Sequence, residues 1–273
     1  MDVGSTVLVL VDRAGGAQAA LQKASLLARH LGAVIELFSC DAEHAGAVRR
    51  LPTDPAARDV IEACFNDNSR YLEALRSSVV ARDLDIRQCV ACAASVIEGL
   101  AARVAALSPL LVVCGVVEGG MRGSRLTLRP ELIQLVKQVT APILLTRGAP
   151  WAPSPRIAMA PDFNAPDPDT RERVLEIAHR LCAGCHGSLM EAEEGASRES
   201  RALCEFVDRG QADILVVAGC SRPQAFASRE PELEALLGAV TCDLLIVPRS
   251  PVDSSAVTRF AVAFRANSAN RQP

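Results

Sequence analysis

Two Cys-x-x-Cys pairs are the residues of this chain whose types and spacing most directly suggest chemistry, because paired thiols can hold a metal ion, form a redox couple or attach a haem. Cys89 and Cys92 fall at the end of an expected strand, where residues three apart face opposite sides of a sheet. Cys182 and Cys185, followed by His186, match the attachment pattern of a c-type haem. Haem attachment requires export from the cytoplasm, and the first residues do not resemble a signal peptide.

We expect the ten cysteines to be structural, free and metal-free, because neither pair has a convincing set of further ligands. Two alternatives stay open for the second pair, namely a metal cluster that includes His179 and a redox couple. Other cysteines stand where Ala or Val would fit an apolar pattern, as at Cys114, Cys204 and Cys242.

The remaining polar residues form no catalytic constellation. The histidines show neither the His-Glu-x-x-His nor the His-x-His spacing of metal sites, and no serine stands in a Gly-x-Ser-x-Gly setting. The carboxylates of Asp162, Asp167 and Asp169 share one Pro-rich stretch, which we expect to be a solvated loop. The sequence therefore predicts a protein that is not an enzyme.

Composition narrows the choice of partners. The chain has 273 residues, of which 49% are hydrophobic and 3% are aromatic, with a formal net charge of −3. Scarce aromatic residues and the lack of a basic block argue against nucleic-acid binding. No apolar run approaches the roughly 18 residues of a membrane span. Together with the N-terminal residues, this composition leads us to expect a cytoplasmic protein without a membrane or nucleic-acid partner.

Short apolar runs alternate with segments of helix length. In the first half, β-rich runs lie at 6–11, 34–40, 85–91, 110–115 and 142–147. The helix-length segments between them lie at 17–31, about 55–82, 94–107 and 130–138. This alternation predicts right-handed crossovers and a parallel sheet, and so an α/β fold.

The same plan then appears a second time. Residues 156–160 restart the scheme of residues 6–12, and residues 214–219 match residues 110–115. The second half is shorter. Its second strand is expected at 186–192, and the long helix and the third strand of the first half have no counterpart.

These boundaries divide the chain into four parts. They are a first domain at 1–147, a linker at 148–155, a truncated second domain at 156–249 and a C-terminal tail at 250–273. We expect Trp151, the only tryptophan, to pack into a crevice between the halves.

Several stretches resemble the universal stress protein family, and above all its tandem, UspE-like members with two domains in one chain. They are Val7–Asp12, Ala24–Leu31, Leu110–Gly115, Ala141–Leu145 and Ala149–Trp151. The resemblance implies a HUP-like five-stranded parallel sheet with strand order 3-2-1-4-5, from which the second domain lacks edge strand three and its helix. It also implies an intramolecular pseudo-dimer, paired through the strands at 142–147 and 243–248, and leaves a homodimer open.

The resemblance further implies where an adenine nucleotide would bind. Nucleotide-binding members carry an Asp after strand one that contacts adenine, and a glycine motif after strand four whose N–H groups approach phosphates. In the first domain Asp12 and Gly115 match this pattern. With Gly119, Gly120, Gly123 and Ser124, which would form a displaced anion-binding loop, they are the candidates for cofactor binding.

Both copies depart from that motif. In the first domain Glu118 stands at the second glycine position, and residues 128–130 replace the final Gly-Ser or Gly-Thr pair. In the second domain Gly219 remains, Arg222 replaces the second glycine, and Pro161 stands near the adenine-contacting position. A carboxylate repels phosphate and side chains block close backbone approach, so we expect ATP to bind weakly or not at all, with no obligatory cofactor.

The resulting expectation is a cytoplasmic stress-response protein that acts as a non-catalytic scaffold for an unknown small ligand or protein. Three alternatives stay open: an adenine-nucleotide sensor that uses the first domain alone, a weak ATPase, and a flavoprotein-like electron-transfer domain.

Overall fold

The structure is a computed structural model of the chain. It describes residues 5–13, 16–50, 54–79, 83–116, 134–136, 138–163, 167–193, 199–219, 230–248 and 262–267.

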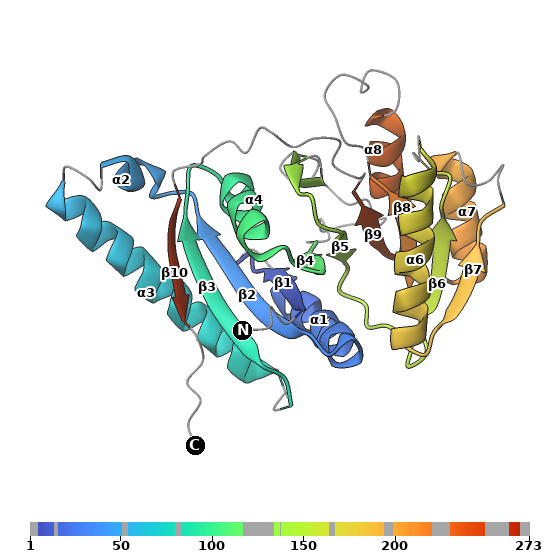
Figure 1. Cartoon of the computed structure of the whole chain (residues 1–273), viewed down its shortest axis with the longest axis horizontal. Coiled ribbons are helices and arrows are strands. Elements are labelled where there is room, and N and C mark those ends of the chain that lie inside the picture. The colour runs from blue at the N-terminus through green and yellow to red at the C-terminus, as the bar shows by residue number, and fades with distance from the viewer. Residues whose placement is uncertain are drawn as a thin grey trace.

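One ten-stranded sheet runs through the molecule in the order β10-β3-β2-β1-β4-β5-β9-β8-β6-β7 (Figure 1). Its strands are β1 (Thr6–Leu10), β2 (Val34–Asp41), β3 (Ile86–Cys92), β4 (Leu111–Gly115), β5 (Ile143–Thr146), β6 (Arg156–Ala160), β7 (Ser188–Glu191), β8 (Ile214–Ala218), β9 (Asp243–Val247) and β10 (Ala263–Asn267). The first half contributes β3-β2-β1-β4-β5, all parallel, and the second half contributes β9-β8-β6-β7, also parallel. The α/β fold class and the missing edge strand of the second half are therefore confirmed.

The two halves meet at an antiparallel pair of strands. β5 pairs with β9, and Leu144 stands opposite Leu245. Thus the strands at 142–147 and 243–248 are joined by hydrogen bonds, and the two parallel sheets expected from the sequence are one continuous mixed sheet. Pairing removes two apolar edges that would otherwise be open to other chains.

The described helices are α1 (Ala17–Leu31), α2 (Ala45–Arg50), α3 (Pro55–Ser78), α4 (Val96–Leu107), α6 (Pro168–Gly184), α7 (Ser200–Gly210) and α8 (Glu230–Ala239). Residues at their N-termini determine where two of these helices begin. The Asp54 carboxylate accepts a hydrogen bond from the N–H of Ala56 with proline at the first helical position, and Asp167 caps α6 in the same way through Thr170. Asp167 thus caps a helix, although from the sequence we expected it in a solvated loop.

None of these helices combines the length and apolar composition needed to cross a membrane.

The helices cover both faces of the sheet. Apolar residues of α1, α3 and α6 pack on one face, and those of α4, α7 and α8 pack on the other. Every residue of β8 and β9 is buried, as expected for parallel strands covered on both sides.

Strand β10 was not predicted, because its residues were assigned to the C-terminal tail. It returns to the first half and pairs antiparallel with β3, with Phe264 opposite Ala91 (Figure 1). Arg265 of β10 hydrogen-bonds Asn66, pairs with Glu62 and lies 5.1 Å from the ring centroid of Phe65. The strand thus contacts α3 as well as β3.

A buried polar cluster ties the halves together. The Lys23 Nζ atom of α1 donates to Asp243 Oδ2 of β9 at 2.6 Å, and Trp151 Nε1 donates to the same oxygen at 2.7 Å. Arg147 completes the cluster, with its backbone N–H on Asp243 Oδ1 at 2.8 Å and its carbonyl accepting from Lys23 at 2.9 Å. Burial raises the pKa of the Asp243 carboxyl, while Lys23 and the N–H donors oppose that rise. Trp151 therefore lies between the halves, as expected.

Candidate ligand cavity of the first half

A cavity of about 880 Å³ opens at the carboxyl ends of β1, β2 and β4. This position lies at the switch in strand order between β1 and β4, where ligands of open α/β sheets bind. The described wall combines residues that follow three strands with one face of α3 and the start of α4. The wall comprises Leu10, Val11, Asp12, Arg13, Ser39, Cys40, Asp41, Ala42, Glu43, His44, Val60, Ala63, Cys64, Asp67, Asn68, Val96, Ile97, Cys114, Gly115, Val116 and Leu135.

Two of the six predicted cofactor-binding residues line this cavity. Asp12 follows β1 and Gly115 ends β4. Gly119, Gly120, Gly123 and Ser124 lie outside the described residues, as do Glu118 and residues 128–130.

Gly115 also has a structural role that needs no ligand. A Cβ atom built on it would lie 2.6 Å from the carbonyl carbon and oxygen of Gly16, which itself adopts a φ of 76° before α1. Two backbones therefore touch at this point, and only glycine fits.

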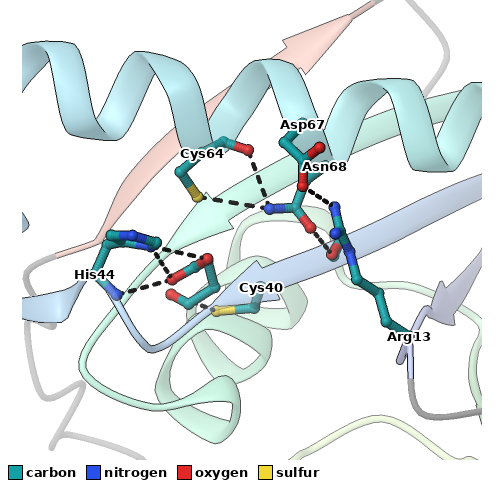
Figure 2. Close-up of polar contacts among 8 residues, drawn as sticks. Arg13, Cys40, His44, Cys64, Asp67 and Asn68 are labelled. Carbon is teal, nitrogen blue, oxygen red and sulfur yellow. Dashed lines mark hydrogen bonds and ion pairs between the residues drawn. The ribbon is translucent and has the colours of Figure 1, made fainter.

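A group of hydrogen-bonded and ion-paired side chains on the cavity wall was not predicted from the sequence. Arg13 pairs with Asp67 at 2.6 Å, the Ser39 hydroxyl donates to Asn68 Oδ1 at 3.0 Å, and Asn68 Nδ2 donates to the carbonyl of Cys64 at 3.0 Å (Figure 2). Cys64, Asp67 and Asn68 stand three and four residues apart, which places them on one face of α3. That spacing is the signal that could have found them.

A second group on the same wall combines a carboxylate, an imidazole and a thiol. His44 donates its backbone N–H to Asp41 Oδ1 at 2.9 Å, and its Nδ1 atom lies 3.1 Å from both carboxylate oxygens. The ligand atoms of Asp41, His44 and Cys64 all lie within 4.8 Å of one another. Burial acts to raise the pKa of Asp41, but hydrogen bonds from the His44 backbone, the Cys64 thiol and the His44 ring outweigh it, so the pKa is lowered.

The thiols near this group differ in their ionisation. Burial raises the pKa of Cys40 to about 12, so this thiol is neutral at pH 7. The hydrogen bond between Cys64 and Cys92 raises the pKa of Cys64, with burial adding to the rise, and it lowers the pKa of Cys92. Cys64, on the wall, thus has Cys92 as a hydrogen-bond partner outside the wall and lies next to the Asp41 carboxylate.

The two Cys-x-x-Cys motifs do not form the centres that their spacing suggested. Cys89 and Cys92 lie in β3 and pack in opposite apolar layers, as expected for residues three apart in a strand. Cys182 donates to the carbonyl of Gly187 at 3.1 Å, and burial raises the pKa of Cys185 to about 11. Among the described residues, the one group with metal-binding geometry is Asp41, His44 and Cys64, and it does not include His179.

The matching region of the second half has a different character. Phe163, three residues after β6, is fully buried in the apolar layer that also contains Ala192 and Val217. A Cβ atom built on Gly219, the counterpart of Gly115, would lie 2.9 Å from Ile246 Cγ2. Arg222 lies outside the described residues.

Comparisons with solved structures place this architecture among known folds. No protein-family model and no curated protein matches the chain. A functionally unknown protein from Pseudomonas aeruginosa PAO1 matches with a TM-score of 0.61 and 16% identity, over 90% of this chain and 92% of that one. A protein assigned to the universal stress proteins from Pseudomonas aeruginosa UCBPP-PA14 gives 0.59 and 15%, over 90% and 93%. A universal stress protein from Archaeoglobus fulgidus DSM 4304 gives 0.58 and 10%, over 90% and 96%. The chain therefore has the fold of the universal stress proteins.

Proposed function

We propose that this chain is a cytoplasmic, UspE-like tandem universal stress protein, which binds a small ligand in the first-half cavity and acts in the stress response without catalysis. The fold, the doubled strand order and the joined halves support the family and its tandem organisation. The single observation that carries the ligand-binding role is the cavity of about 880 Å³ at the switch point of the first half.

The chemistry of the wall defines the ligand class. Its described carboxylates are Asp12, Asp41, Glu43 and Asp67, against a single arginine, Arg13. A wall with this charge repels a polyphosphate, attracts a cation and does not repel a neutral molecule. Val11, Val60 and Ile97 supply an apolar side, so the ligand is amphipathic, with hydrogen-bond donors directed at the carboxylates.

A non-catalytic role is supported by the composition of the same wall. Burial keeps Cys40 protonated, and His44, the one histidine of the described wall, is directed at Asp41 rather than at a nucleophilic hydroxyl. An activated nucleophile would need a base within hydrogen-bond reach.

The second candidate function is an adenine-nucleotide sensor. It is favoured by one observation, which is that Asp12 and Gly115 line the same cavity. In this case adenosine should bind more tightly than ATP, because the carboxylates oppose the phosphates but not the nucleoside.

Calorimetric titration with adenosine, and with ATP and magnesium, separates these functions. For the scaffold we expect native mass spectrometry to show a retained non-nucleotide molecule, and ATP to bind more weakly than about 10 μM. Adenosine or ATP binding tighter than this value, lost in Asp12→Ala, would establish the sensor instead, and ATP hydrolysis lost in the same variant would establish the ATPase.

A pair of matched variants tests whether the cavity is the binding site. Val60 lines it and is exposed on α3, whereas Leu26 is equally exposed on α1 but lies outside the wall. Val60→Phe should weaken binding of the retained molecule at least 10-fold, and Leu26→Phe should leave it unchanged. Equal effects of the two substitutions would place the ligand elsewhere.

A further inference from the structure

The structure assigns to Asp41, His44 and Cys64 a binding site for a divalent transition metal ion of the zinc class, on the wall of the first-half cavity. This inference replaces the expectation that the cysteines are metal-free, and it does not depend on the organic ligand proposed above.

Three separate elements bring the donors together. Asp41 ends β2, His44 stands just before α2, and Cys64 lies in the middle of α3. One oxygen, one nitrogen and one sulfur atom, each a possible ligand, lie within 4.8 Å of one another, and the nitrogen lies 3.1 Å from the oxygen. A tetrahedral zinc ion with bonds of about 2.0–2.3 Å needs donors about 3.3–3.8 Å apart, so small side-chain movements complete the site.

The donor types select the metal. Thiolate, imidazole and carboxylate are the ligands that zinc uses, whereas magnesium and calcium require oxygen donors throughout. One carboxylate and one thiolate balance the two charges of the ion. The imidazole binds through Nδ1 once that atom gives up its contact with the carboxylate.

Burial differs across the site. Cys64 is 6% exposed, and Cys92, its hydrogen-bond partner, is fully buried behind it. The His44 side chain is 42% exposed. All three donors line the cavity, and His44 and Cys64 approach the same space from the residue before α2 and from α3 (Figure 2). A metal ion held here has its protein ligands on one side and a coordination position directed into the cavity, where a ligand or water can bind.

Hydrogen bonds from neighbouring groups also orient two of the proposed metal ligands. Asp41 accepts the backbone N–H of His44, which fixes the carboxylate next to the imidazole. Cys92 contacts Cys64 through its thiol, so it orients the sulfur ligand from behind. Such partners position metal ligands and tune their affinity.

The test is a titration of the purified, reduced full chain with Co²⁺ and with Zn²⁺. We expect one equivalent of cobalt to give a thiolate-to-cobalt charge-transfer band and tetrahedral visible bands, both abolished by one equivalent of zinc and unaffected by excess magnesium. Cys64→Ser should remove the charge-transfer band, and His44→Gln should weaken zinc binding by more than about 100-fold, since loss of an outer partner alone weakens it about 10–100-fold.

Cys40→Ser is the matched control, because Cys40 is adjacent to Asp41 and lines the same cavity but its sulfur is directed at the carbonyl of Ser95. It should bind cobalt like the wild type. The inference is overturned by the absence of binding tighter than about 1 μM, by a charge-transfer band that persists in Cys64→Ser, or by a band that Cys182→Ser removes instead. Circular dichroism on each variant ensures that lost binding is not lost folding.

Discussion

The two halves of the chain share a strand order but use the carboxyl ends of their strands differently. In the first half Asp12 and Arg13 follow β1 and line a cavity. In the second half Phe163 follows β6 and is fully buried among apolar side chains. A repeated fold therefore constrains the sheet and its crossovers, but the residues just beyond the strands decide whether a half binds a ligand or fills its own core.

The prediction with the largest expected effect concerns Lys23→Met and tests whether the two halves unfold as one cooperative unit. Lys23→Met removes the cationic partner of Asp243 and leaves a buried carboxylate without its charge partner. We expect the free energy of unfolding to fall by about 3–5 kcal/mol, as for other broken buried ion pairs. Chemical denaturation followed by circular dichroism measures the loss.

The double variant Lys23→Met, Asp243→Leu is its control. Replacement of both charges by apolar groups should recover part of the loss, because neither member of the ion pair is then left as an unpaired buried charge. A single substitution that costs less than about 1 kcal/mol, or a loss confined to one of two separate transitions, would show that the halves are stable independently.

The next effect compares equivalent glycines of the two halves. Gly115→Ala places a Cβ atom 2.6 Å from the backbone of Gly16, which cannot move without shifting α1. Gly219→Ala meets Ile246 Cγ2 at 2.9 Å, and that side chain can adjust. We expect a loss of about 1–3 kcal/mol for the first and about 1 kcal/mol or less for the second, by thermal unfolding.

Gly148→Ala is the reference for this pair and should be neutral, because none of the described residues lies within 4 Å of the position that its new Cβ atom would take. Equal losses at Gly115 and Gly219 would mean that the backbone contact in the first half does not distinguish it from the second.

Much of this fold could be predicted from the sequence, because its signals are local and appear twice. Apolar runs predicted nine of the strands of the described chain to within a few residues, and Asp54-Pro55 marked the start of α3. Asp12 and Gly115 line one cavity because they lie at the carboxyl ends of β1 and β4, two strands that the resemblance made neighbours.

The rest depends on contacts between residues far apart in the chain. β10 pairs with a strand more than 170 residues earlier, as Ala263 opposite Cys92 shows, and no local pattern encodes such pairing. Asp41 and His44 are three residues apart, but Cys64 reaches them only because α3 packs over β2 and β3. The spacing of the two Cys-x-x-Cys pairs drew attention away from this group.

A smaller effect concerns pH and the Asp41 carboxylate. Its folded pKa lies below the ordinary value of 3.8, so it contributes stability that is present above that pH and is lost as pH falls through the folded pKa. Asp41→Asn should therefore cost about 1 kcal/mol at pH 7, and this cost should shrink as the pH falls below 3.8. Asp162→Asn, which breaks a more exposed pair with Arg171 in the second half, should cost less than about 0.5 kcal/mol at pH 7. Denaturant unfolding across this pH range measures both, and a cost for Asp41→Asn that persists at low pH would contradict an ionised native carboxylate.

The smallest expected loss of stability comes from a comparison of the two ends of the sheet. At the end of the sheet formed by the first half, β10 pairs with the edge of β3. Arg265 of β10 also contacts α3, through Glu62, Asn66 and the ring of Phe65. On the side of the second half the sheet ends at β7. Arg265→Ala should lower global stability by about 0.5–1 kcal/mol, because its polar partners Glu62 and Asn66 are exposed.

Its local effect should be clearer than its global one. The N–H groups of β10 and those of β3 bonded to it should exchange with deuterium faster in Arg265→Ala, while the amides of β1 and β4 remain protected, because opening one outer strand does not unfold the centre of the sheet. Arg201→Ala, which removes an exposed pair with Glu205 on α7, is the control in the second half and should change neither. Unchanged exchange in β3 would mean that backbone pairing alone holds β10 in place. Accelerated exchange across the whole sheet would instead make β10 part of the cooperative core, and the two ends of the sheet would then differ in stability as well as in covering.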